Sequence, residues 1–322
     1  MMHFTVHELK MARYVRIELE VIGGTRPRLT FFHKDKKQKF FFKTYTHTPR
    51  EIWTECLASH IAELMQLKAQ KVTIKTAPER LETILRERFP KLPTKWKPVG
   101  TLARNIFPKN IETIYGAAIV ETPTKPLTLE VIEKKFRQKY YASEDLLQSY
   151  SDMVVFDALI GNMDRHHENW GVCNDIKYRQ QLLVDRTALI SLRYFTPLFD
   201  HGSSLMFELS EEIIESMLVD EKVLFNYVEK SRFGFILDST GSKVNMFDLI
   251  ESHVRAKSPW GKRFNKSLYK VKKLDLLELA SVVIKMPSLE ILEYSTNRRR
   301  ILYKAMCLRY NRLIDIYEQA IK

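Results

Sequence analysis

The sequence FDALIGNMDRHHENWGV, residues 156–172, is an apolar segment interrupted by a run of polar and charged residues. Within it, Asp164 and Asn169 follow the pattern D-x-x-x-x-N. In phosphoryl-transfer loops with this spacing, the aspartate accepts the proton of the attacking hydroxyl and the asparagine binds a metal ion. That reaction needs an oriented hydroxyl and positive charge beside the phosphate oxygens. The spacing therefore predicts Asp164 as a catalytic base and Asn169 as a metal ligand.

A second acidic ligand is expected downstream, because Mg²⁺ prefers carboxylate and amide oxygens. The segment TPLFDHGSSL, residues 196–205, supplies Asp200, which follows an apolar stretch that we interpret as a strand and precedes Gly202. An Asp-x-Gly sequence at the end of a strand is typical of a metal-binding segment. Asp185, in LLVDRTA, is a less favoured alternative because no small residue there frees the backbone. We predict Asn169 and Asp200 as the metal ligands.

Candidate phosphate-binding residues precede this loop in the chain. Lys43 lies in the strand-like segment KFFFKTY, and Glu55 follows twelve residues later in a predicted helix, where it can hold the lysine. Gly23 and Gly24 form a turn before that strand, where backbone N–H groups can approach phosphate. Taken singly, these features are usually a solvated lysine, a surface glutamate and a plain hairpin turn. Their order along the chain is what predicts an ATP site.

The first part of the chain has the pattern of a strand-rich lobe. Alternating apolar residues predict strands in 13–45 and at 71–76, with a helix at 78–89 and a surface loop over 90–100. A helix is predicted over 48–67, with Thr48 as N-cap, Pro49 at the first helical position and Glu51 completing a capping box. A further strand beginning at residue 112 leads into a linker that contains two prolines, near 121–127.

Helical patterns dominate beyond that linker. They cover 127–140, 144–160, about 209–230, about 271–284 and 288–320. The sequence therefore predicts an α+β protein with two lobes, a strand-rich N-terminal lobe at 1–122 and a helical C-terminal lobe at 123–322.

The bulk composition is that of an ordinary soluble globular protein. The chain has 322 residues, of which 45% are hydrophobic and 28% charged, and its net charge of +13 favours an anionic partner. Its three cysteines form no close pair, which indicates reduced thiols and a cytoplasmic location. We expect neither a signal peptide nor a transmembrane helix.

The two motif segments resemble the catalytic signature of the HipA-like serine/threonine kinases. Their pattern is roughly L-I-G-N-x-D-R-H-x-x-N-x-G followed by P-x-x-D, which IGNMDRHHENWG and PLFD match closely. The likeness is dense over 150–206, extends to 20–68, and elsewhere depends on the order of the elements. The length is similar to that of compact members, which lack an additional N-terminal subdomain.

This resemblance implies an ATP- and Mg²⁺-dependent fold distantly similar to protein and phosphoinositide kinases. It implies that Asp164 is the base, that Asn169 and Asp200 bind metal, and that Lys43 binds phosphate. It also makes His166 part of the loop scaffold, holding a backbone or carboxylate group.

The resemblance also implies possible regulation and partners. Members of the family often autophosphorylate a serine of the phosphate loop, whereas this chain has Thr25 in IGGTRPRL. Several members are toxins that act on aminoacyl-tRNA synthetases and are held by a helix-turn-helix antitoxin protein, so both are candidate partners. We expect the adenine contacts near Ile119–Glu121.

Two other functions fit parts of the sequence. A phosphoinositide kinase is the alternative within the enzyme class, because a related D-R-x-x-x-N loop serves lipid kinases. The second alternative is a binding protein that keeps the fold and uses a basic surface, such as Arg298–Arg300, to hold a partner or RNA. The intact base and metal positions argue against this second alternative, and direct nucleic-acid binding is not expected.

Overall fold

A computed structural model gives the fold of this chain. It describes residues 7–18, 28–34, 38–45, 48–90, 92, 95–106, 111–120, 127–140, 144–175, 193–238, 240–285 and 294–321. Five residues named above lie outside the described residues, namely Gly23, Gly24, Thr25, Glu121 and Asp185. Among the described helices, none is long and apolar enough to cross a lipid bilayer.

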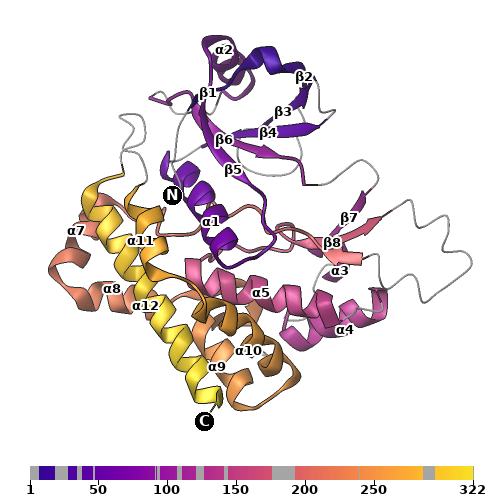
Figure 1. The fold of residues 1–322 in the computed structure, drawn as a ribbon, viewed down its shortest axis with the longest axis vertical. Helices are drawn as coiled ribbons and strands as arrows, with labels where there is room; N and C mark the ends of the chain where they lie inside the picture. Colours follow the sequence, from indigo (N-terminus) through magenta and orange to yellow (C-terminus); the bar gives the residue numbers. More distant parts are fainter. Residues whose placement is uncertain are drawn as a thin grey trace, which may run out of the picture.

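The first part of the chain forms a twisted sheet with strand order β1-β5-β6-β4-β3-β2 (Figure 1). The pair β1–β5 is parallel and the other neighbours are antiparallel. Successive side chains of a strand point to opposite faces of the sheet. In the strand that carries the predicted lysine, Phe42 and Thr44 are buried on one face and Lys43 points to the other. The strands are β1 (His7–Glu8), β2 (Tyr14–Glu18), β3 (Arg28–His33), β4 (Lys39–Thr44), β5 (Val72–Thr76) and β6 (Val99–Arg104), with a 3₁₀ turn at Met11–Arg13.

Helix α1 (Arg50–Leu64) packs against β5 and β6 and lies between the sheet and the helical part, whereas α2 (Glu79–Arg88) lies at the far end of the sheet (Figure 1). The predicted helix is confirmed. The Thr48 hydroxyl accepts from the Arg50 backbone N–H at 3.4 Å, as expected of a capping residue, and from the Arg50 side chain at 2.9 Å. The return bond from Glu51 that would complete the capping box stays a prediction. Because Glu51 is buried, its carboxylate belongs to the core side of the helix.

A small antiparallel sheet, β7 (Ile111–Tyr115), β8 (Gly171–Asp175) and β9 (Arg193–Phe195), follows. The strand predicted from residue 112 ends at Tyr115, because the chain turns into the short helix α3 (Gly116–Val120). The amides of Gly116 and Ala117 donate to the carbonyls of Trp170 and His167 at 2.8 and 2.9 Å. These bonds to the motif loop end the strand. The predicted loop over 90–100 is also too long, since β6 begins at Val99.

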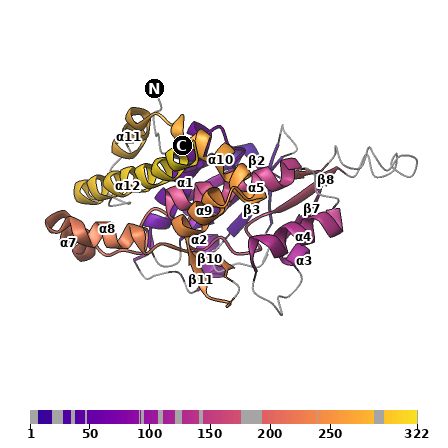
Figure 2. The same ribbon diagram turned by 90° about the horizontal axis from the view of Figure 1, so that it is seen from below.

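The second part is mainly helical, and α5 lies at its centre (Figures 1 and 2). The helical pattern over 209–230 corresponds to two helices instead of one. Asp220 begins the second helix as its N-cap, where its side chain accepts from the Lys222 amide at 2.9 Å. Two helices, α9 and α10, and a hairpin were not anticipated by the sequence. The elements are α4 (Leu129–Tyr140), α5 (Glu144–Ile160), α7 (Glu211–Val219), α8 (Glu221–Glu229), β10 (Arg232–Leu237), β11 (Lys243–Asn245), α9 (Met246–Arg255), α10 (Pro259–Lys272), α11 (Leu276–Ile284) and α12 (Thr296–Ile321).

Candidate active site

Three of the predicted residues meet where the sheet, α1 and the segment after β9 come together. The Lys43 Nζ lies 2.5 Å from an Asp200 carboxylate oxygen and 3.9 Å from a Glu55 oxygen. Lys43 and Asp200 are both partly exposed, whereas the Glu55 carboxylate is buried. The lysine thus lies between two carboxylates, one internal and one open to solvent.

Helix α1 holds the segment that carries Asp200. The other Glu55 oxygen accepts from the His201 amide at 3.0 Å, and the Thr54 hydroxyl donates to the Gly202 carbonyl at 2.9 Å. The left-handed backbone conformation occurs at Asp200 itself, with φ of 57°. Our expectation that Gly202 frees the backbone is therefore wrong, because aspartate tolerates this conformation and supplies the turn alone.

The motif loop begins where α5 ends. Gly161 has φ of +63°, which favours glycine, and a Cβ at this position would lie 2.4 Å from the Arg309 guanidinium and displace it. The side chain of the next residue, Asn162, makes two hydrogen bonds. Its Nδ2 donates to the Asp157 carboxylate at 3.1 Å, and its Oδ1 accepts from the Asp164 backbone N–H at 3.2 Å. The glycine and asparagine of the motif therefore set the direction in which Asp164 leaves the helix.

A buried arginine ties this loop to the Asp200 segment. Arg165 makes two hydrogen bonds of 2.9 Å to the Asp157 carboxylate, and its other donors bind the carbonyls of Asn169 at 3.2 Å and Phe199 at 2.5 Å. Burial alone would lower the pKa of the Arg165 guanidinium, but the Asp157 carboxylate outweighs it and raises that pKa. The arginine is thus a charged internal clamp. Arg165 therefore holds the motif loop in place against the Asp200 segment.

The Asp164 carboxylate is exposed, whereas Asn169 is buried and donates from its amide to the Asp164 carbonyl at 3.3 Å. The Ser203 hydroxyl lies 3.4 Å from an Asp164 carboxylate oxygen. Asn169 and Asp200 offer amide and carboxylate oxygens, which is the donor chemistry that Mg²⁺ prefers. No group of three or more His, Cys, Asp or Glu side chains that could hold a metal ion occurs in the described part of the chain.

His201 follows Asp200 and is fully buried. Its Nδ1 lies 2.8 Å from an Arg165 nitrogen, and because arginine only donates, Nδ1 accepts and the imidazole is neutral. Burial, helped by the Arg165 charge, lowers the pKa of His201 well below its ordinary value. His201 therefore stays unprotonated in the folded protein at pH values at which it is protonated in the unfolded chain.

This burial predicts a pH-dependent stability. Below a pH of about 6.5 the unfolded chain binds a proton that the folded chain does not, so the unfolding free energy decreases as pH falls, by at most about 1.4 kcal/mol per pH unit. Urea unfolding at pH 7.5 and 5.5 measures this change. His201→Asn, whose amide oxygen can still accept from Arg165, should flatten the dependence. His167→Asn, at a less buried ring, is the control, and an equal slope in wild type and His201→Asn would refute the prediction.

The remaining predicted residues lie around this centre. The His166 ring accepts from the Glu168 amide at 3.3 Å, which confirms that it holds a backbone group within the loop. Ile119 is fully buried in α3, and its role in adenine binding stays a prediction. Trp170 is a core residue that stacks on Phe195.

Arg298, the first residue of the basic segment Arg298–Arg300, is not exposed to solvent. Arg298 is buried in α12 and bonds Glu211 at 2.7 Å and the carbonyls of Met206 and Leu209. These contacts join α12 to α7 and the segment before it. Arg298 is therefore not available for phosphate contacts on the surface, contrary to the alternative role considered for it.

Two positioning residues were missed from the sequence. Asp157 is a fully buried acid within the apolar C-terminal part of α5, and a buried carboxylate almost always has a partner, which was the available signal. Gly234, in β10, passes the loop so closely that a Cβ there would lie 2.2 Å from the Met163 carbonyl oxygen. No local pattern in the sequence connects β10 with a loop seventy residues earlier.

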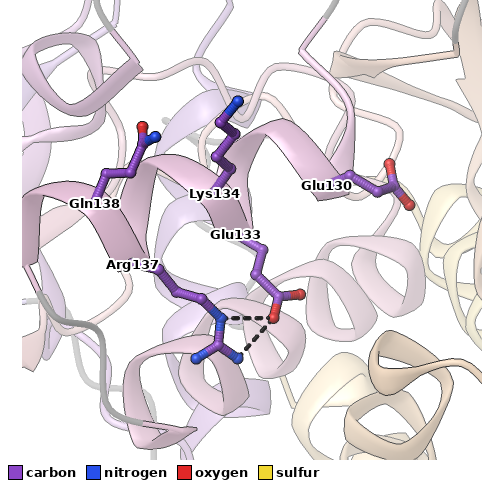
Figure 3. A pocket seen from close by; sticks show the side chains of 5 residues that line it. All are labelled: Glu130, Glu133, Lys134, Arg137 and Gln138. Atoms are coloured by element: carbon purple, nitrogen blue, oxygen red, sulfur yellow. Dashed lines mark hydrogen bonds and ion pairs between the residues drawn. The ribbon is translucent and has the colours of Figure 1, made fainter.

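A surface pocket of about 420 Å³ lies elsewhere, on α4. It is lined by Glu130, Glu133, Lys134, Arg137 and Gln138 (Figure 3). Glu133 and Arg137 bind each other at 2.7 Å, and Lys134 and Gln138 point away from that pair (Figure 3). All five side chains come from α4, so the pocket has none of the predicted phosphate, metal or base residues.

The fold was compared with those of known proteins. No protein-family model and no curated protein sequence matches the chain. Among solved structures, the crystal structure of the Helicobacter pylori proinflammatory kinase CtkA matches with a TM-score of 0.71. The match covers 94% of this chain and 94% of that chain, at 17% sequence identity. This chain therefore has a mixed fold, with a sheet-rich part and a helical part, that matches the two-lobed architecture of that kinase.

Proposed function

We propose that this protein is an ATP- and Mg²⁺-dependent phosphotransferase that phosphorylates serine or threonine residues of a protein. The observation that carries the proposal is the ion pair between Lys43 and Asp200, with Glu55 behind the lysine. These residues come from a strand, a loop and a helix that are far apart in the sequence. Arg165 connects the same Asp200 segment to the loop of Asp164 and Asn169.

The residues around Lys43 have the chemistry needed to bind nucleotide phosphates. A Lys43 ammonium that now faces a carboxylate can face phosphate oxygens instead, while Glu55 keeps it oriented. Asp200 and Asn169 would hold Mg²⁺, which when bound neutralises charge on the β- and γ-phosphates. Glu55 has a second task, because its bond to the His201 amide fixes the backbone next to Asp200.

Asp164 would act on the acceptor. Its carboxylate is exposed and can face an incoming hydroxyl, and it would take the proton as the oxygen attacks the γ-phosphorus. A positioned general base contributes about 10²–10⁴ in rate. The Asn162 side chain accepts from the Asp164 backbone N–H and the Asn169 side chain donates to the Asp164 carbonyl, so little reorganisation is needed at the moment of reaction.

The class of acceptor is tested by offering several acceptors together. The protein is incubated with γ-labelled ATP and Mg²⁺ in the presence of a mixture of generic acceptor proteins and of vesicles that contain phosphatidylinositol. Label on serine or threonine of protein supports the proposal. Label in the lipid would instead show a phosphoinositide kinase. Binding of RNA without any transfer of label would show a binding protein.

Replacing Lys43 tests the phosphate-binding role. Lys43→Met removes the cation between Glu55 and Asp200, so we expect the KM for ATP to rise or kcat to fall, lowering kcat/KM by at least about 10²-fold. Steady-state kinetics with varied ATP measure the loss. Lys39→Met, on the same strand, should change kcat/KM less than threefold. Equal effects of the two substitutions would contradict the assigned role.

A further inference from the structure

Ser203 places a hydroxyl beside the proposed base. Its Oγ lies 3.4 Å from Asp164 Oδ2, and the side chain is only partly buried. An acceptor hydroxyl must come within hydrogen-bond reach of the base, and such contacts are often longer before the nucleotide binds. Ser203 therefore occupies the kind of position that the hydroxyl of a substrate would take.

The backbone on both sides of Ser203 is fixed. On one side, the Gly202 carbonyl accepts from Thr54 at 2.9 Å, and Asp200 is only three residues away. On the other side, the Leu205 amide donates to the Ile160 carbonyl at 2.9 Å. These bonds anchor the segment to α1 and to the end of α5. They hold the backbone of the residue whose hydroxyl lies 3.4 Å from the Asp164 carboxylate.

The neighbouring serine is held differently. Ser204 is buried, and its Oγ donates to the His201 carbonyl at 2.6 Å. Its hydroxyl thus closes a turn in the backbone. The two adjacent serines differ in environment, and this makes Ser204 a matched control for Ser203.

We propose that Ser203 is an intramolecular phosphoacceptor of this protein, an inference that rests on the proposed function. The Ser203 Oγ forms a bond to the γ-phosphorus of ATP, while the bond from that phosphorus to the β,γ-bridging oxygen breaks. ADP leaves with the electron pair of the broken bond. The hydroxyl proton passes to Asp164, and the product is phosphoserine at 203 plus ADP.

The modification would inhibit further transfer. Phosphoserine carries about −1.5 to −2 charges at neutral pH, and it would lie against the Asp164 carboxylate. Arg165, the buried cation of the loop, is already bonded to Asp157 and is not available to pair with this charge. The phosphate would fill the acceptor position and add like charge beside the base.

The test follows phosphate on Ser203 and activity in the same sample. Protein that has been dephosphorylated is incubated with ATP and Mg²⁺ at two protein concentrations tenfold apart, with a generic acceptor protein added to aliquots. Trypsin releases residues 194–222 as one peptide, since no Lys or Arg lies between Arg193 and Lys222. Fragmentation of this peptide distinguishes Ser203 from Ser204, Ser210 and Ser216.

We expect phosphate on Ser203 at a first-order rate that dilution does not change. Ser204→Ala should keep the label, whereas Ser203→Ala and Asp164→Asn should lose it. Transfer to the acceptor protein should decrease at least tenfold as Ser203 becomes phosphorylated. In Ser203→Ala, by contrast, the rate should be the same before and after incubation with ATP.

Three results would overturn the inference. If the acceptor protein is labelled while Ser203 stays unmodified, Ser203 is not an acceptor and the proposed kinase function stands. If Ser203 is labelled ten times more slowly after tenfold dilution, the transfer is intermolecular. If bound ATP and Mg²⁺ label neither Ser203 nor any acceptor, the proposed function fails together with the inference.

Discussion

Arg165→Met is expected to destabilise the protein by about 3–5 kcal/mol, because it leaves the Asp157 carboxylate buried without its partner. It also removes the bonds to the Asn169 and Phe199 carbonyls, which join the two proposed metal-binding segments. Phosphoryl transfer by the fraction that remains folded should fall by more than about 10²-fold, because the loop loses its alignment. Urea unfolding and single-turnover transfer measure the two effects.

The double variant Arg165→Met/Asp157→Leu separates stability from alignment. Replacing both members of a buried ion pair by apolar residues is often nearly neutral for stability. We expect the double variant to regain most of the lost unfolding free energy but little of the lost activity. An unfolding free energy of Arg165→Met within about 1 kcal/mol of wild type would show that the clamp is not needed.

Gly234→Ala is expected to lower kcat/KM by about 10²-fold while the protein stays folded. The added Cβ would lie 2.2 Å from the Met163 carbonyl oxygen, and because that atom belongs to the backbone, the loop itself must shift. A displacement of about 1 Å at Asp164 is enough for such a loss. Overpacking of this kind costs about 1–3 kcal/mol of stability, which circular dichroism on heating detects.

The hairpin offers a control for this substitution. Lys243, on β11, is exposed, so Lys243→Ala should leave kcat/KM within twofold of wild type. The change in Gly234→Ala should appear mainly in kcat, because ATP contacts from the first part of the chain are untouched. Full activity in Gly234→Ala would contradict the prediction, because it would mean that the backbone at Met163 accommodates the added Cβ without displacing Asp164.

The elements with strong alternation or helical periodicity were predicted well. The helix at 144–160 matches the structure to the residue, since its apolar residues pack against neighbouring elements. The contact of Lys43 with Glu55 and Asp200 was expected only as a consequence of the order of motifs. In the structure the three residues are in contact, with the Lys43 Nζ 2.5 Å from Asp200 and 3.9 Å from Glu55.

What the sequence did not predict depends on contacts between distant segments. The short helix after Tyr115 forms because the motif loop offers carbonyls to Gly116 and Ala117. The left-handed turn falls at Asp200 rather than Gly202, since α1 fixes the amide and carbonyl beyond it. The closeness of Gly234 to Met163 has no local signal at all. Propensity and spacing identify residue types, whereas these positions are set by tertiary packing.

Asp164 is proposed to serve phosphoryl transfer from ATP held near Lys43 and Asp200. The most direct measurement is single-turnover transfer from γ-labelled ATP, with protein in excess and Mg²⁺ present, for wild type and Asp164→Asn. We predict that both bind ATP with similar affinity and that the variant transfers label about 10²–10⁴ times more slowly. Equal rates in the two proteins, or no transfer by wild type that has bound ATP and Mg²⁺, would contradict the account.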